Sequence, residues 1–219
     1  MGSVANSLLR FFRGGASAQE QTGPGAPAGS RRSSGLGELT RLLKGSEGLA
    51  VLDLGPTSPA NIAHFTNLGH RVYNEDVLLA AQNPEYKIKC EDGTTEVDVD
   101  RFFRENLVFK NVKFDAVLCW DISDYMTEPL VKPMIERIAC VMNPKGYLLA
   151  FFHTKDAGAE APYFRYHIDG AETLKLQRGP KFSLQRVFNN RHVENLFRDY
   201  GSLKFFLARD NVREVLVVR

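Results

Sequence analysis

From residue 36 onward, the hydrophobic positions follow helical and strand-like patterns in alternation. Apolar residues at helical spacing predict helices over 39–43, 60–68, 129–142 and 191–200. Short apolar runs predict strands over 49–54, 71–74, 116–120 and 147–152. Strands that alternate with helices in this way are typical of a parallel sheet with helices on both faces.

The last two strand-like segments follow a different rule. Segments 203–208 and 212–218 are separated only by Arg209, Asp210 and Asn211, so they must pair as an antiparallel hairpin. Between Asp76 and Phe114 the pattern is weak, and we predict a short strand near Val97 and a helix over 100–107. The pattern therefore predicts an α/β fold, with a Rossmann-like, mostly parallel sheet that ends in an antiparallel hairpin.

Two segments stand outside this alternation. Residues 14–35 consist mostly of Gly, Ala, Ser, Pro and Gln, so we predict a flexible tail over 1–35 ahead of a domain over 36–219. Within the tail, residues 4–13 have the composition of a short amphipathic helix that contacts a membrane or a partner, although a frayed terminus is the simpler interpretation. The insertion at about 154–185 is long for a connection, and its alternating segments 163–168 and 173–178 predict a β-hairpin arm.

Composition narrows the class of protein. The chain is 43% hydrophobic and 25% charged, as globular proteins are, and no apolar run approaches the roughly 20 residues of a transmembrane helix. Three widely spaced cysteines predict neither a disulfide framework nor a metal site. We predict a cytoplasmic protein, while the Arg-bearing start, free of acidic residues before Glu20, is also typical of a mitochondrial presequence.

The charge distribution gives little information about partners. Residues 151–219 carry 12 basic and 8 acidic residues, an excess that is ordinary for a solvated surface. Because no recognition motif accompanies this excess, nucleic acid is a less favoured partner, although charge alone does not rule it out. The sequence makes no prediction about the oligomeric state.

The chemistry-bearing residues lie at the ends of the predicted strands. Gly55 follows the first strand and would allow the backbone to approach a ligand closely. Asp76 ends the second strand, 76 − 53 = 23 residues after Asp53. A carboxylate at that place typically accepts hydrogen bonds from the two hydroxyls of a ribose. The pattern therefore predicts a nucleoside site.

Four motifs in order resemble those of class I S-adenosyl-L-methionine-dependent methyltransferases. They are VLDLG at 51–55, GHRVYNED at 69–76, FDAVLCWD at 114–121 and MNPKGYLLAFF at 142–152. The resemblance covers about 36–219 and implies a seven-stranded sheet whose last strand is antiparallel. It also implies that S-adenosylmethionine lies across the carboxyl ends of the strands and gives its methyl group to an unidentified acceptor.

The resemblance also implies roles for individual residues. Asp53 and Gly55 would line the methionine part of the cofactor, Asp76 would hold the ribose, and Trp120 and Asp121 would flank the methyl-donating end. Apart from the resemblance, the hydroxyls of Thr57 and Ser58 can donate hydrogen bonds to a carboxylate. The adenine-binding acid does not align, and Asp98, Asp100 and Asn106 are its candidates. The absence of a G-x-G-x-x-G run counts against a nicotinamide-dependent oxidoreductase.

The turn after Gly55 departs from the family's pattern. Thr57 and Pro59 stand where the later glycines usually fall, and proline has no N–H to offer a ligand. An alternative interpretation follows from this departure: a methyltransferase-like domain without catalysis that serves as a binding or scaffold subunit.

On the acceptor side, the sequence predicts positions and leaves the chemistry open. Asp124, Tyr125 and His153 follow two strands and are the candidates for a catalytic group that removes a proton; each is equally interpretable as a loop polar group. Residues 163–166 of the arm, with the sequence Tyr-Phe-Arg-Tyr, would form an aromatic and cationic lid for a flat or anionic acceptor. An arm that packs on the domain or on a second subunit is the alternative.

Overall fold

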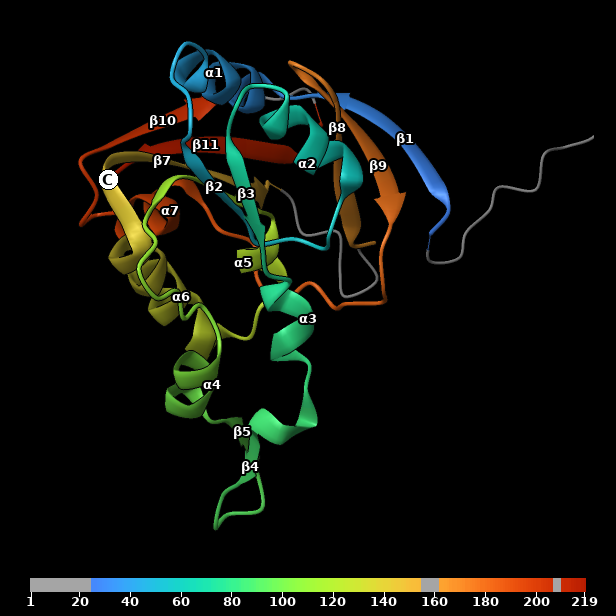
Figure 1. Ribbon diagram of the computed structural model, residues 1–219. Helices are drawn as coiled ribbons and strands as arrows, with labels where there is room; N and C mark the ends of the chain where they lie inside the picture. Colours follow the sequence, from blue (N-terminus) through green and yellow to red (C-terminus); the bar gives the residue numbers. More distant parts are fainter. Residues whose placement is uncertain (1–24, 155–161, 207–209) are drawn as a thin grey trace, which may run out of the picture.

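The main sheet has six strands in the order β10-β11-β7-β6-β2-β3 (Figure 1). This computed structural model describes residues 25–154, 162–206 and 210–219. The strands are β2 (Ala50–Asp53), β3 (Arg71–Asn74), β6 (Phe114–Trp120), β7 (Met142–His153), β10 (Ser202–Phe206) and β11 (Val212–Val218). Strands β3, β2, β6 and β7 are parallel, whereas β11 pairs antiparallel with both β7 and β10.

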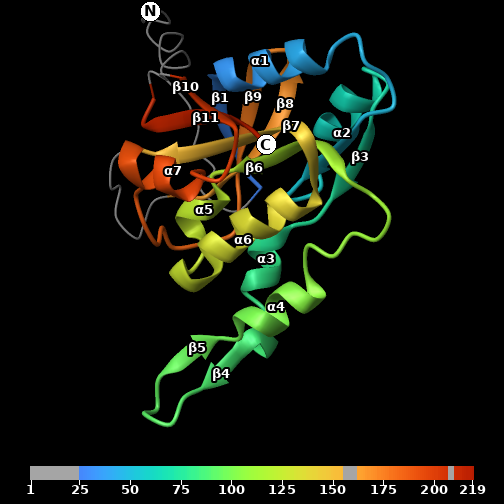
Figure 2. The same cartoon turned by 90° about the vertical axis from the view of Figure 1, so that its left-hand side faces the viewer.

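The expectation of a seven-stranded sheet is wrong, because the main sheet has no strand beyond β3 among the described residues. The segment predicted to supply a strand near Val97 forms instead a separate hairpin of β4 (Lys87–Lys89) and β5 (Thr95–Val97), which projects away from the sheet (Figure 2). Its residues are almost all exposed. A strand without an apolar face gains little from adding to the sheet, which explains the difference.

Helices cover both faces of the sheet. Helices α1 (Ser34–Leu43) and α2 (Pro59–Thr66) pack through Leu39 and Phe65 on the face that also carries Val51 and Phe151. On the opposite face lie α4 (Val99–Glu105), α5 (Ile122–Tyr125), α6 (Glu128–Val141) and α7 (Asn190–Leu196). The short α3 (Val77–Ala81) and the 3-10 turn η1 (Pro84–Tyr86) lead from β3 toward the projecting hairpin (Figure 1).

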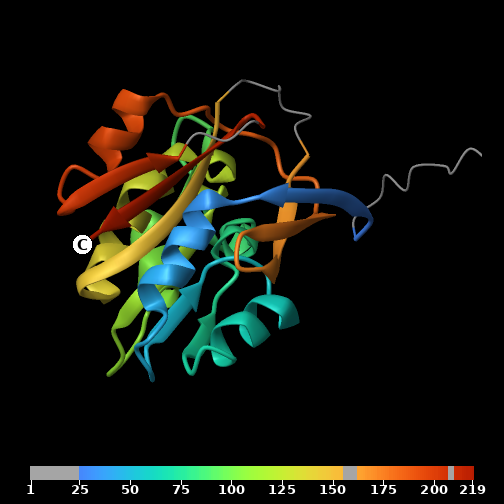
Figure 3. The same ribbon diagram turned by 90° about the horizontal axis from the view of Figure 1, so that it is seen from above.

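The arm forms part of a second sheet. Strands β8 (Phe164–Gly170) and β9 (Thr173–Arg178) pair antiparallel, and β1 (Pro27–Arg32) adds to β9 (Figure 3). The prediction of a flexible tail is therefore wrong for residues 27–35, which form β1 and begin α1. Backbone pairing and one buried arginine order this segment, neither of which composition reveals. The predicted amphipathic helix at 4–13 lies outside the described residues.

None of the described helices combines the length and apolar character needed to cross a membrane.

Candidate cofactor and acceptor site

The carboxyl ends of four parallel strands place the candidate residues along one edge of the sheet. The chain passes from β2 to β3 on one side and returns to β6 on the other, so the order reverses at β2. Such a reversal opens a crevice at the strand ends where α/β proteins bind ligands. The Gly55 turn, Asp76, Asp121 and His153 follow or end these four strands and so share this edge.

Asp53 is buried, with only 2% of its surface exposed, and its carboxylate is occupied within the protein. Its Oδ1 accepts hydrogen bonds from Gly55 N at 3.0 Å and from Trp120 Nε1 at 2.7 Å, and its Oδ2 accepts one from Asn61 Nδ2 at 2.8 Å. Burial raises the pKa of Asp53, and these three donors oppose the rise. Asp53 therefore joins the turn, helix α2 and the end of β6.

Gly55 allows a close approach, but the group that approaches is a side chain of the protein. A Cβ atom added at Gly55 would lie 2.9 Å from Cδ1 of Trp120. The Trp120 indole stacks on the Tyr166 ring, with centroids 5.3 Å apart and an interplanar angle of 13°. Trp120 and Tyr166 are both buried, so the two rings cover the turn at which the resemblance places the methionine part of a cofactor.

The rest of the turn is held by Asn74 and by the arm. The Thr57 hydroxyl donates to Asn74 Oδ1, and Asn74 Nδ2 donates to Gly55 O at 2.7 Å and to Asp53 O at 3.0 Å. Ser58 caps α2 and hydrogen-bonds His167 of β8 at 2.8 Å. Thr57 is therefore directed toward Asn74, a residue that the sequence analysis did not select although it ends a strand.

Asp76 is the more accessible of the two strand-end acids. It is half-buried and caps α3, accepting a hydrogen bond from Leu79 N at 3.0 Å. Burial raises its pKa, while the Leu79 N–H and the positive charge of Arg165 lower it. A carboxylate that is exposed in part and has one short-range partner fits the ribose contact that the resemblance implies.

The candidates for the adenine contact serve local structure. Asp98 caps α4 through Arg101 N at 2.9 Å, and Asn106 Nδ2 donates to the Tyr86 hydroxyl at 2.9 Å. Asp100 lies at a shallow cavity between α4 and α6, beside Arg104. The geometry therefore does not single out one of the three candidates.

At the ends of β6 and β7, two buried aspartates and a histidine form a cluster. Asp121 Oδ2 accepts a hydrogen bond from the Tyr166 hydroxyl at 2.8 Å, whereas its Oδ1 has no partner among the described residues. Burial raises the pKa of Asp121 to about 6. Asp124 Oδ2 accepts from His153 N at 2.6 Å and hydrogen-bonds His153 Nδ1 at 2.8 Å.

The charges in this cluster act on one another. Burial lowers the pKa of His153, but the hydrogen bond to Asp124 and the charges of both aspartates outweigh burial, so the pKa is raised. For Asp124, burial raises the pKa, and the hydrogen bonds and charge of His153 oppose this rise. Asp124 and His153 are thus brought together as a pair, in which Asp124 fixes the orientation of the imidazole ring.

Tyr125 has a structural place beside this pair. Its hydroxyl donates to Pro162 O at 3.1 Å, and its ring packs edge-on against Tyr163 at 5.2 Å. Burial raises the pKa of Tyr125 far above its usual range. A phenol that keeps its proton and anchors the base of the arm is not suited to act as a base.

The arm packs on the domain itself. Asn61 of α2 donates to Tyr166 O at 3.1 Å and accepts from Ile168 N at 2.8 Å. Tyr163 and Tyr166 point into the protein, while Phe164 lies beneath the Arg178 guanidinium and Arg165 is half-buried. The aromatic residues predicted as a lid thus form a fixed cover in this structure.

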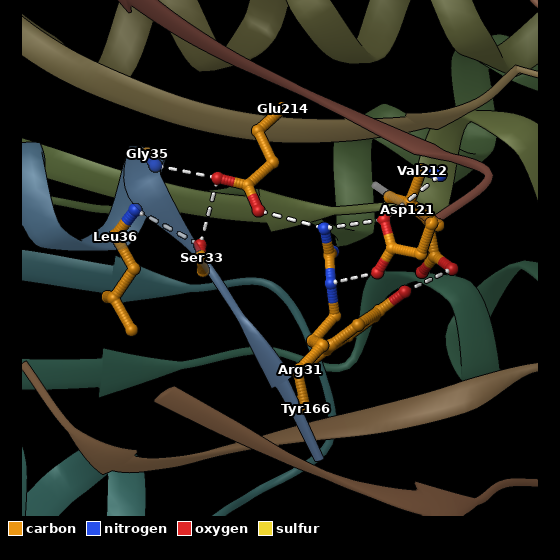
Figure 4. Close-up of polar contacts among 9 residues, drawn as sticks. Arg31, Ser33, Gly35, Leu36, Asp121, Tyr166, Val212 and Glu214 are labelled. Carbon is orange, nitrogen blue, oxygen red and sulfur yellow. Dashed lines mark hydrogen bonds and ion pairs between the residues drawn. The ribbon is translucent and has the colours of Figure 1, made fainter. Parts of the chain in front are cut away.

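Arg31 and Glu214 form a buried ion pair that the sequence analysis missed (Figure 4). Arg31 Nη2 donates to Glu214 Oε1 at 2.9 Å, and Arg31 Nε lies 2.8 Å from Asp210 Oδ2. Glu214 Oε2 accepts from Ser33 Oγ at 3.0 Å and from Gly35 N at 2.6 Å. A signal was present, because Glu214 interrupts an apolar strand and a buried acid requires partners.

Comparison with known proteins finds similarity only to solved structures, at low sequence identity. No protein-family model and no curated protein matches the chain. Among similar solved structures is the 1,6-didemethyltoxoflavin-N1-methyltransferase of Burkholderia thailandensis, crystallised with 1,6-didemethyltoxoflavin and S-adenosylhomocysteine. It is 15% identical, with a TM-score of 0.47 over 85% of this chain and 79% of that chain.

Two further structures have the same level of similarity. The glycopeptide N-methyltransferase MtfA, crystallised with S-adenosylhomocysteine, is 16% identical, with a TM-score of 0.42 over 84% of this chain and 88% of that chain. TehB from Haemophilus influenzae is 12% identical, with a TM-score of 0.45 over 84% of this chain and 61% of that chain. The function proposed for this chain therefore rests on its own residues.

Proposed function

We infer that this chain is an S-adenosylmethionine-dependent methyltransferase whose cofactor binds across the carboxyl ends of β3, β2 and β6. The observation that carries this proposal is the meeting of the Gly55 turn, Asp76 and Asp121 at the point where the strand order reverses. A glycine turn and a strand-end acid at such a point suit a nucleoside ligand. The cofactor, when bound, supplies a methyl group on a positively charged sulfonium.

The residues fit the two ends of this cofactor differently. Asp76 suits the two ribose hydroxyls, since it is half-buried and the next residue, Val77, donates its N–H to Leu54 O, directly before Gly55. At the methionine end, the Trp120 indole lies against Gly55, and the Tyr166 ring stacks on the indole. Binding there therefore requires these two side chains to move.

On the acceptor side, we assign the proton-accepting role to His153. Asp124 holds Nδ1, so Nε2 is the ring atom that can receive a proton from the acceptor. Asp124 is a positioning residue, because it acts through the imidazole ring. Because the pKa of His153 is raised, its ring stays protonated to a higher pH than that of an ordinary histidine. The neutral ring, which can accept a proton, becomes the main form only above that pH.

Calorimetric titration of the full chain with S-adenosylhomocysteine tests this proposal. We expect saturable binding, and we expect Asp76→Ala to weaken it by about 1 to 3 kcal/mol, the usual effect of removing a charged hydrogen-bond acceptor. The matched control is Asp92→Ala, since Asp92 is an exposed acid in the β4–β5 hairpin whose side chain bonds Thr94 alone among the described residues. If correctly folded protein gives no heat of binding, the methyltransferase proposal is wrong, and the alternative of a non-catalytic binding or scaffold subunit is favoured.

A further inference from the structure

A second site is indicated by a cavity of about 500 Å³ between α6 and α7. Its walls come from the start of α6, from the segment that precedes α7, and from one face of α7. None of the residues assigned above to the cofactor lines it. Small-molecule sites commonly have volumes of about 300 to 1,000 Å³, so the cavity is large enough for a small organic ligand.

The inner surface of this cavity is apolar. Met126, Val131 and Phe188 line it and are buried, and Leu196 lines it from α7. The Phe188 ring packs against Phe152, with centroids 5.5 Å apart. Such a surface favours the hydrocarbon or aromatic part of a ligand, since the ligand removes apolar area from water when it binds.

The segment that forms one wall is fixed by hydrogen bonds. Gln185 N and Arg186 N both donate to Asp124 O, at 2.7 Å and 3.2 Å. Arg213 Nη1 donates to Phe188 O at 2.9 Å. A wall that is already ordered loses little conformational entropy on binding, which favours a ligand site over an accidental gap.

The polar groups of the lining have a positive balance. Lys132 and Arg186 are cationic, and Glu128 is the one acid among the lining residues. Arg186 Nη1 donates to Glu128 Oε1 at 2.7 Å. The other N–H groups of the guanidinium can then donate to a ligand. Lys132 lies 3.6 Å from Glu136 and both side chains are exposed, so this ion pair is weak and the ammonium remains available.

We propose that this cavity binds a small amphipathic anion, a carboxylate carried on a hydrocarbon or aryl body. The body lies on Met126, Val131 and Phe188, and the carboxylate lies near Lys132 and Arg186. This assignment depends on the lining alone, so it stands or falls independently of methyl transfer. A ligand with a cationic head would meet two cations and one acid, Glu128, which already pairs with Arg186.

Titration with three eight-carbon probes tests the class of ligand. The full chain is titrated with octanoate, 1-octanol and octylammonium by calorimetry at one salt concentration. Octanoate binds most tightly, by about tenfold over octanol, the ratio that one charge-assisted hydrogen bond gives. Equal binding of octylammonium and octanoate, or no saturable binding of octanoate, overturns the proposal.

Two variants locate the binding. Val131→Trp fills the cavity and reduces octanoate affinity at least tenfold, while the matched control Ile62→Trp, at an exposed position on α2, leaves the affinity unchanged. If Val131→Trp does not fold, Lys132→Gln decides: it weakens octanoate and leaves octanol unchanged, with Lys87→Gln on the projecting hairpin as control. Unchanged octanoate affinity in folded Val131→Trp, or in Lys132→Gln, overturns the site.

Discussion

Asp53 ends β2 and Asp76 follows the end of the neighbouring parallel strand β3, yet the structure uses the two acids differently. Asp53 is buried and accepts three hydrogen bonds that join the turn, α2 and β6. Asp76 is half-buried and accepts one, from the helix that it caps. The comparison teaches that two acids at equivalent places in the fold differ in burial and in the number of donors, and on this difference we propose Asp76 and not Asp53 as the ligand-binding acid.

The same contrast occurs between two adjacent arginines of β1, and there the expected effect is largest. The Arg31 side chain is 6% exposed and pairs with Glu214, which is 1% exposed; the Arg32 side chain is 76% exposed and pairs with Glu172. Arg31→Ala leaves a buried carboxylate unpaired, which we expect to cost about 3 to 5 kcal/mol of unfolding free energy. Urea denaturation of the variant and the natural chain measures this loss of unfolding free energy.

Arg32→Ala is the control for this prediction. It removes an exposed ion pair, for which we expect a loss of about 0 to 1 kcal/mol. Similar losses in the two variants would mean that β1 contributes through its backbone pairing with β9 and that the buried ion pair adds nothing.

Asp53→Ala should have the next largest effect. The change leaves the Trp120 indole N–H, the Asn61 amide and Gly55 N without their acceptor. Unpaired buried donors cost about 1 to 3 kcal/mol, so we expect the variant to lose about 3 kcal/mol in the same denaturation experiment. A loss below 1 kcal/mol would mean that water reaches these donors and that Asp53 is closer to a ligand-binding acid than its burial suggests.

The sequence predicted the parts of the fold that depend on apolar patterning. Strand β6 and helix α6 follow the predicted segments closely, because β6 is an almost continuous buried run and the buried residues of α6 recur at helical spacing. Apolar patterning did not predict β1, which is ordered by its pairing with β9 and by Arg31. It also gave the wrong place to the segment near Val97, whose exposed residues form a separate hairpin. Neither outcome depends on local apolar periodicity.

For the candidate site, the sequence predicted which residues reach the edge of the sheet and not what they do there. Asp124 and His153 are 29 residues apart, and only the parallel pairing of β6 and β7 makes them neighbours. The indole of Trp120 lies against Gly55, donates to Asp53 and stacks on Tyr166 of the arm, and the stacking is a tertiary interaction that no motif encodes.

Asp121 extends the comparison to a buried acid that lacks a full set of donors. Its pKa is raised to about 6 in the folded chain. Between about pH 4 and 6 the Asp121 carboxyl is therefore ionised in the unfolded chain and still protonated in the folded chain. Stability attributable to Asp121 is therefore present below about pH 4 and lost as the pH rises to about 6. The loss should amount to about 2 to 3 kcal/mol.

Asp121→Asn tests this assignment because it keeps an acceptor for the Tyr166 hydroxyl and removes the titration. We expect the variant to gain stability relative to the natural chain as the pH rises from 4 to 6, measured by urea denaturation across that range. A constant difference between the two proteins over the range would show that Asp121 titrates normally, and that its buried Oδ1 is solvated.

Apart from the Arg32→Ala control, the smallest effect on stability is expected at Asp76, and this prediction separates the two acids most directly. Asp76→Ala removes the cap of α3, which typically costs about 1 kcal/mol, well below the loss expected for Asp53→Ala. Asp76→Asn keeps a capping oxygen and removes the charge, so its stability should change less. If Asp76 is the ribose acid, both variants weaken S-adenosylhomocysteine binding although both remain folded. If the asparagine variant binds as tightly as the natural chain, Asp76 is a helix cap alone, and the two acids differ only in how many hydrogen bonds each one accepts.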